Sequence, residues 1–362
     1  MASRTTNSAL KAVAVFAAAF FYNCLGAECA PAAKGKGSQC AKYSGIGGQA
    51  VMEGVMMRHD DEYAVAVRKP DGEIAVKAEP WKGIVPIKVL YKIPFIRGIF
   101  SFVDSLALGM KTLNYSVDFY TDEGIPKEEA SFDEGHEGES PSGSGAKEKK
   151  SGGILTGAVM GIAVLISIGL FMVLPYFASL FFKAWVKNPY LLALIEGCIR
   201  LGVFIAYVLS ISRMEDIRRV FCYHGAEHKC INCLETGKPL TVENVRESSK
   251  QHRRCGTSFL LYVMVVSILL FALIQTPNRV LKVVLRIVFV PVIAGIAYEF
   301  IRLAGRSNNP LVRLLSAPGL IMQGLTTREP DDSMIEVGIR SVEAVFDWKS
   351  YLKENFGDSP SA

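Results

Sequence analysis

The sequence predicts a membrane α-helical bundle of about four spans, together with a small α+β cytosolic domain that contains a β-hairpin. Four long apolar runs predict the bundle, because each approaches or exceeds the roughly 20 residues that a helix needs to cross a bilayer. A composition that is 50% hydrophobic, with a mean hydropathy of +0.26, agrees with this class. Alternating apolar and polar residues on both sides of a Pro-Asp-Gly turn predict the hairpin.

Residues 1–40 are the first predicted segment, a targeting or anchor segment whose fate the sequence leaves open. An Ala-rich apolar stretch, ALKAVAVFAAAFF, precedes a piece rich in Gly, Lys and Cys that has almost no acidic residue. A secretory signal, an organellar transit peptide and a membrane anchor all fit this pattern.

Residues 41–120 are predicted to form the small mixed domain. It contains the hairpin, within YAVAVRKPDGEIAVKAEPW, and at 93–117 a helix whose apolar spacing suits a protein core or a membrane interface. The acidic, Gly/Ser-rich segment 121–153 has no hydrophobic period, so it is predicted to be a disordered linker. His136 lies in that linker and is not expected to bind a metal.

The membrane bundle is predicted to occupy 154–305, with a polar loop rich in His and Cys at 213–256. Its apolar runs are 154–182, 189–212, 258–275 and 281–303. Basic residues cluster before the first run, in the polar loop and after the fourth run, so the positive-inside rule directs all three regions to the cytoplasm. The expected location is therefore the plasma (inner) membrane, multi-pass, with the polar loop and both soluble parts facing the cytoplasm.

Residues 306–362 are predicted to form a C-terminal cytosolic segment. Its portion 334–347 has the spacing of an amphipathic helix, with Ile335, Ile339 and Val342 on one face. Gly338 lies inside this helix and weakens the prediction.

Charge and cysteine content limit the partners and the compartment. The net charge of +5 is small, and the basic residues lie beside apolar runs without interleaved aromatics, so nucleic acid is not an expected partner. The expected partners are the lipid bilayer and other membrane proteins. Eight cysteines without a regular spacing indicate reduced thiols or metal ligands rather than a disulfide framework.

The segment YHGAEHKC in the polar loop contains the chemistry-bearing motif. His224 and His228 are four apart, so on a helix both project from one face, with Glu227 on the adjoining face. The spacing has the form of the inverted zincin motif H-x-x-E-H, in which a metal polarises a water and the carboxylate takes its proton. Gly225 between the histidines weakens the helix.

The sequence offers several residues as a third ligand for a divalent metal, which is expected to be zinc. His252 and Cys255 lie just before the third apolar run, and Glu299 lies near the inner end of the fourth. His252 or Glu299 as third ligand leaves an open position for water, whereas Cys255 as a fourth ligand closes the shell and favours a structural metal. Cys230 and Cys233 form a C-x-x-C pair, but the second C-x-x-C pair that a zinc ribbon needs is missing.

A structural reading competes with a metal site. The histidines of the loop can accompany arginines at the headgroup level of a membrane, where they contact lipid phosphates or water.

Inside the second apolar run, Glu196 and Arg200 are four apart and are expected to pair, because an unpaired charge in a bilayer is costly. That pair serves equally well as a polar path or as a clamp between helices.

Five segments together match a known pattern: GGQAVMEGVMMR, YHGAEHK, LTVENVR, RCGTSF and PGLIMQGLTTREP. From about 45 to 346 the chain resembles the bacterial YqhQ-type family of multi-span membrane proteins, a domain of unknown function whose members are often labelled predicted metal-dependent enzymes. The resemblance points to the residues of two motif groups. These are His224, Glu227, His228, His252 and Cys255, and, in the first segment, Gly48, Gln49, Glu53, Gly54 and Arg58.

The leading hypothesis is an integral membrane protein with a zinc-type site on its cytosolic face, a metal-dependent hydrolase. In it Glu227 is the catalytic base, and His224, His228, His252 and Cys255 supply the metal ligands, with His252 as the third. The alternative is a non-catalytic membrane scaffold or regulator of a membrane complex, in which any metal is structural. A carrier that uses Glu196 and Arg200 is a weaker third reading.

Overall fold

The computed structural model describes the chain in seven stretches. They are residues 42–85, 89–91, 93–120, 161–163, 165–274, 279–307 and 309–357. The predictions for residues 1–40 and for the linker at 121–153 lie outside these stretches. The described residues form two compact units, one from those before 121 and after 205, and the other from those between 121 and 205. Every residue of the candidate site belongs to the first unit.

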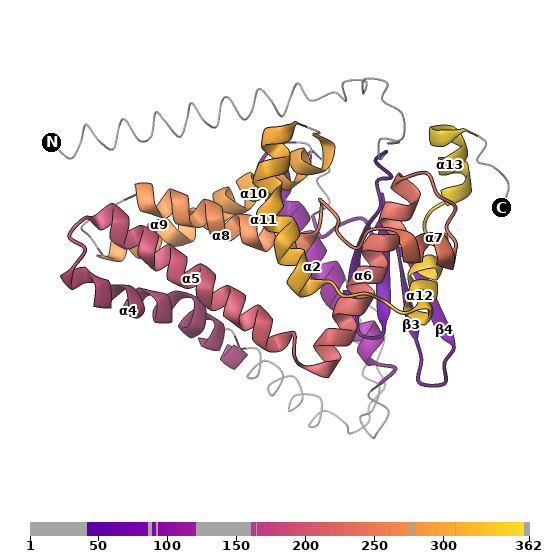
Figure 1. Cartoon of the computed structure of the whole chain (residues 1–362), viewed down its shortest axis with the longest axis horizontal. Coiled ribbons are helices and arrows are strands. Elements are labelled where there is room, and N and C mark those ends of the chain that lie inside the picture. Colours follow the sequence, from indigo (N-terminus) through magenta and orange to yellow (C-terminus); the bar gives the residue numbers. More distant parts are fainter. Residues whose placement is uncertain are drawn as a thin grey trace, which may run out of the picture. The chain divides into compact units, whose positions relative to one another are not determined.

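A four-stranded antiparallel sheet is the centre of the first unit (Figure 1). Its strands, in spatial as well as sequence order, are β1 (Gly47–Val51), β2 (Gly54–His59), β3 (Glu62–Arg68) and β4 (Ile74–Pro80). The hairpin predicted at the Pro-Asp-Gly turn is confirmed as β3 and β4. A second hairpin, formed by β1 and β2, was not predicted from the sequence; it has a two-residue turn in which Glu53 takes a φ of 50°.

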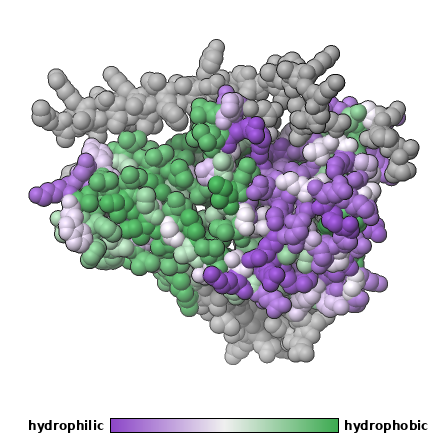
Figure 2. Space-filling view, viewed as in Figure 1, coloured by the Kyte–Doolittle hydropathy of each residue, from purple (hydrophilic) through white to green (hydrophobic). Residues whose placement is uncertain are grey.

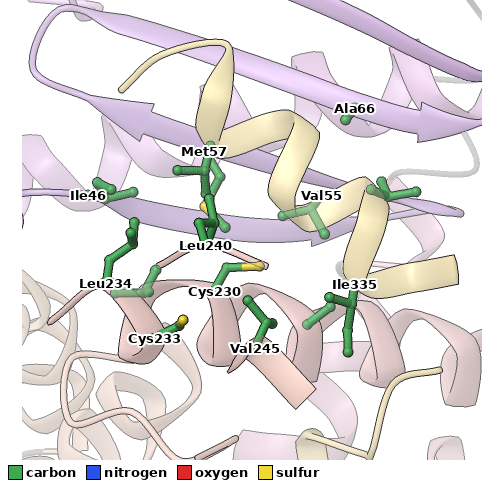
Figure 3. Packing of buried hydrophobic residues seen from close by; sticks show 14 of the residues in the cluster. Ile46, Val55, Met57, Ala66, Cys230, Cys233, Leu234, Leu240, Val245 and Ile335 are labelled. Atoms are coloured by element: carbon green, nitrogen blue, oxygen red, sulfur yellow. The ribbon is translucent and has the colours of Figure 1, made fainter. Parts of the chain in front are cut away.

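Helices cover both faces of the sheet. The helices α6 (Glu215–Glu235) and α12 (Asp332–Glu343) pack on one face, and α2 (Ile96–Val117) packs on the other. Strand alternation explains this arrangement: Val55 and Met57 of β2 point to α6 and α12, whereas Met56 points to the face covered by α2. Figure 3 shows the first of these cores, where side chains of β2 meet those of α6 and α12.

Three further helices of this unit pack against one another beside the sheet domain. They are α8 (Gly256–Leu273), α10 (Val290–Arg306) and α11 (Pro310–Thr326). Gly319 brings α11 close to α8, because a Cβ there would overlap the Tyr262 hydroxyl. Ser258 on α8 donates to the backbone oxygen of Gly319 at 3.0 Å, which fixes the two helices at this contact.

Four helices are long and apolar enough to cross a membrane. They span Gly161–Ala184, Pro189–Ile211, Gly256–Leu273 and Val284–Gly305. Within the first unit, Figure 2 shows hydrophobic residues gathered over α8 and the adjoining α9 (Arg279–Val288), and hydrophilic residues over the sheet and α12. The predicted combination of membrane-length helices with a small β-sheet is therefore present.

The second unit contains the first membrane-length segment and most of the second. Its elements include η1 (Gly169–Val173), α4 (Leu174–Phe181), η2 (Phe182–Ala184) and most of α5 (Pro189–Ile211). The predicted pair on the second apolar run is confirmed, since Arg200 Nη2 lies 3.1 Å from Glu196 Oε1.

The segments predicted as a polar loop and as a C-terminal helix are ordered helices. Residues 213–256 contain α6 and the short α7 (Val242–Glu247), so the H-x-x-E-H motif lies on a helix, as its spacing indicated. The predicted helix at 334–347 is α12, which ends at Glu343, and α13 (Trp348–Phe356) follows it. Gly338 lets α12 approach α6, because a Cβ there would lie 2.9 Å from Cys230 Sγ.

Candidate metal centre

Helix α6 positions the two motif histidines. Glu215 and Asp216 occupy its first turn, where negative charge favours the helix dipole, and Gly237 with φ 80° follows its end. His224 and His228 lie one turn apart on one face, with ring centroids 4.4 Å apart. Both are shielded from solvent: His228 is completely buried, and 12% of the His224 side chain is exposed.

Backbone carbonyls fix the orientation of both rings. His224 Nδ1 lies 2.8 Å from the backbone oxygen of Thr326, and His228 Nδ1 lies 2.6 Å from that of Lys250. Since a carbonyl only accepts, each Nδ1 is assigned the proton and each Nε2 the lone pair. Among the described residues, nothing forms a hydrogen bond with the buried His228 Nε2. An orphaned lone pair of this kind calls for a ligand, because buried polar groups are normally paired.

Cys255 approaches His224 Nε2 from the start of α8. Its Sγ lies 3.2 Å from His224 Nε2 and accepts a hydrogen bond from the backbone N–H of Thr257 at 3.4 Å. The sulfur is therefore at a helix N-terminus, where backbone N–H groups suit a negatively charged ligand. One ligand atom each from His224, His228 and Cys255 lie within 4.8 Å of one another, so this group can hold a metal ion.

Glu227 lies beside this group on the adjoining face of α6. Its Oε2 is 3.9 Å from His224 Nε2, and its side chain is buried against Gly48 of β1. Burial raises the pKa of Glu227 to about 7, and the neighbouring His224 opposes this shift. A Cβ at Gly48 would lie 2.7 Å from the Glu227 Cγ, so a glycine there gives the carboxylate its room.

Gly225 allows another part of the chain to cross α6 next to the motif. A Cβ at this position would overlap the backbone oxygen of Arg328. The backbone N–H of Arg328 donates to Phe221 O at 2.9 Å, which holds the crossing segment in place. The crossing brings the carbonyl of Thr326 to His224. Gly225 weakens the isolated helix, but it also allows the Thr326 carbonyl to reach His224.

His252 is close to the group but is not part of it. Its ring centroid is 5.6 Å from that of His228, and its Nε2 is 3.8 Å from Glu235 Oε2. Burial lowers the pKa of His252 to about 4, against the effect of Glu235. Burial alone would raise the pKa of Glu235, but His252 and Arg254 outweigh it and lower the pKa to about 2. Near neutral pH these shifts favour a neutral imidazole beside a carboxylate that is paired with Arg254.

Gln323 on α11 fixes the backbone of this segment. This fully buried amide accepts from the N–H of His252 at 2.9 Å and donates to its carbonyl at 2.6 Å. Asn232 on α6 donates to the carbonyls of Ser249 and Gln251 at 2.6 and 3.0 Å. No motif in the sequence marks either amide, and the carbonyls of Lys250 and Thr326 could not be predicted because backbone acceptors leave no trace in a side-chain pattern.

The remaining candidate ligands from the sequence have other partners. Glu299 forms an ion pair with Arg97 of α2, with Arg97 Nε 2.6 Å from Glu299 Oε1. Cys230 and Cys233 are buried in the core between α6, the sheet and α12 (Figure 3). Burial raises the pKa of both thiols, Cys233 to about 11, which suits uncharged core residues rather than ligands.

The residues of the first family segment support the sheet and its neighbours. Glu53 forms an ion pair with Arg219 of α6 and accepts from the Tyr223 hydroxyl at 3.1 Å. Arg58 donates to the buried Asp104 of α2 at 2.7 Å. The others pack closely: Gly54 against Ala66, Gln49 against Gly109, and Gly48 against Glu227.

The donor set is chemically suited to a divalent transition metal. Imidazole and thiolate ligands are typical of zinc sites, and three protein ligands leave one coordination position open. The Nδ1 hydrogen bonds to carbonyls are the second-layer contacts that metal-binding histidines commonly make. A metal would also satisfy the orphaned Nε2 of His228.

The helices that carry the site, α6, α8 and α11, all lie in the part of the chain that matches a known family. The model of a family described as "Protein of unknown function (DUF1385)" matches residues 93–348. The chain belongs to this family. It is also 37% identical over 316 residues to "Uncharacterized protein YqhQ" of Bacillus subtilis (strain 168), which covers 85% of this chain and 94% of that protein. No solved structure matches the chain.

The first prediction concerns metal content. Replacing His228 by Ala removes a buried ligand, so the purified full-length protein should fall from about one equivalent of metal per chain to none. Cys255→Ala should have the same effect. Cys233→Ala is the matched control, because this cysteine is buried in the neighbouring core and should leave the metal in place. Elemental analysis is the measurement, and full metal content in His228→Ala would contradict the site.

The second prediction concerns Gly225. Gly225→Ala forces the Arg328 backbone away from α6 and so withdraws the Thr326 carbonyl from His224. We expect zinc affinity to fall by about 10- to 100-fold, as for other lost second-layer contacts. Chelator competition measures it. Gly324→Ala is the control, because a Cβ there meets nothing within 4 Å. Unchanged affinity in Gly225→Ala would show that the crossing does not support the site.

Proposed function

We propose that this chain is a metal-dependent hydrolase built at a membrane surface, with zinc as the metal. His224, His228 and Cys255 hold the ion, and Glu227 is the general base. The buried and unpartnered Nε2 of His228, in a residue that forms one group with His224 and Cys255, is the observation that supports this proposal most strongly. His252, the third ligand expected from the sequence, then acts one layer out, between His228 and Glu235.

The position of Glu227 favours catalysis over a purely structural metal. A structural zinc normally has four protein ligands, whereas the group here supplies three. A bound zinc supplies Lewis acidity that activates water or polarises a substrate carbonyl. Glu227 is close enough to the ligand group to take a proton from that water and to deliver it to a leaving group.

The neighbouring helices support a site at the level of the membrane surface. Cys255 directly precedes α8, one of the membrane-length helices, and Gly305 near the end of α10 packs against the Arg254 side chain. The basic residues of 213–256 favour a cytosolic orientation of this end. We therefore infer that the metal centre faces the cytoplasm, at the ends of α8 and α10.

The third prediction separates catalysis from metal binding. Glu227→Gln keeps the size of the side chain but removes the base, so metal content should stay at the wild-type value while turnover falls by about 10²- to 10⁴-fold. A panel of fluorogenic esters, phosphoesters and amides, tested with the zinc-loaded protein in nanodiscs, provides the readout. Glu247→Gln is the control, because that carboxylate is exposed on α7.

Two outcomes of this experiment would count against a hydrolase. Either full turnover in Glu227→Gln or no turnover in the wild type would leave a membrane scaffold with a structural metal as the better account.

A further inference from the structure

The first strand of the sheet has an open edge. In the order β1-β2-β3-β4, β1 pairs with β2, and no other strand of the described chain pairs with its outer side. The register around the two-residue turn makes Val51 and Gln49 the residues that exchange hydrogen bonds with β2. Gly48 and Ala50 alternate with them, so their N–H and C=O groups point outward.

The two edges of the sheet differ in their protection. Natural sheets guard exposed edges with charged side chains and prolines, which discourage pairing with another chain. The outer strand β4, IAVKAEP, has Lys77 and Glu79 and ends at Pro80. The strand β1, GGQAV, contains no charged residue and no proline. The β1 edge is therefore the one at which another chain could pair.

The unguarded edge runs past the candidate metal centre. Gly48 lies directly against the Glu227 carboxylate, since a Cβ there would be 2.9 Å from Oε1. The other Glu227 oxygen is 3.9 Å from His224 Nε2. Gly47, at the start of the strand, is exposed, and a Cβ on it would meet nothing within 4 Å.

We propose that the β1 edge binds an extended polypeptide as an added strand, and that the substrate of the site is therefore a peptide bond in such a segment. Strand addition uses backbone hydrogen bonds, which Gly48 and Ala50 can supply. A peptide paired there would lie beside Gly48, the residue that packs against the Glu227 carboxylate. The inference rests on the proposed function, because it names the substrate class of the same site.

The reaction would be an ordinary hydrolysis. The oxygen of water bonds to the carbonyl carbon, and the carbon–nitrogen bond breaks. Glu227 passes the proton it received from water to the leaving nitrogen, so a carboxylic acid and an amine are released, and a second proton transfer between them gives a carboxylate and an ammonium ion.

Binding of metal-directed probes tests the inference without requiring turnover. The zinc-loaded full chain is titrated by calorimetry with acetohydroxamate and with the capped tripeptide hydroxamate Ac-Ala-Leu-Ala-NHOH. Both can bind the metal, but only the peptide can pair with the strand. We expect the peptide to bind at least about tenfold more tightly, the gain of a pair of backbone hydrogen bonds. Methylation of its amide nitrogens should remove that gain.

Two proline variants form a matched pair. Ala50→Pro removes an outward N–H from β1 and leaves the ladder with β2 intact, so the peptide should lose most of its advantage while acetohydroxamate binds as before. Ala78→Pro makes the same change on the outer side of β4 and should alter neither affinity. The methylated peptides keep the test valid even where Ala50→Pro reduces folding, because they leave the protein unchanged.

The outcomes separate this inference from the proposed function. Equal affinity of the two hydroxamates, or a peptide advantage that survives both N-methylation and Ala50→Pro, overturns pairing at the β1 edge and leaves the metal centre standing. Failure of both hydroxamates to bind overturns the metal centre itself.

Discussion

Two hydrogen bonds, from Nδ1 of His224 and of His228 to backbone carbonyls, decide what this site can do. They fix the protons on Nδ1, so both Nε2 atoms are left with lone pairs that can bind a metal. Leaving the buried Nε2 of His228 unpaired costs about 1–3 kcal/mol. A metal bond offsets that cost. Glu227 can act as a general base only if a metal bound by these two histidines holds a water beside it.

Segments that are far apart in the sequence build the centre together. The histidines come from α6, Lys250 and Cys255 from the turn before α8, and the Thr326 carbonyl from the end of α11. Because α8 and α11 pack against each other, the same helix pair fixes both of these partners. The hydrogen bonds of Gln323 to the backbone of His252 join the two segments directly. The site therefore depends on the packing of helices that extend away from it.

The sequence predicted what local patterns determine, and missed what depends on contacts between distant segments. Hydropathy predicted the four long apolar helices, and the H-x-x-E-H spacing predicted two histidines on one helical face. The sequence favoured His252 as the third ligand, whereas the structure groups Cys255 with His224 and His228, because the orientation of this non-helical segment depends on Gln323 and on the start of α8. Glycine was interpreted only as a helix breaker, although Gly225 is a site of close backbone approach. The β1–β2 turn has no turn signature, since Glu53 occupies the position of positive φ.

The coordination shell of the bound metal is the most direct test of this account. X-ray absorption spectroscopy at the zinc edge of the purified protein should show one sulfur at about 2.3 Å and two imidazole nitrogens at about 2.0–2.1 Å, with one lighter atom completing four ligands. The sulfur signal should disappear in Cys255→Ala and persist in Cys233→Ala. A shell without sulfur, or with two or more sulfurs, would contradict a centre built from His224, His228 and Cys255.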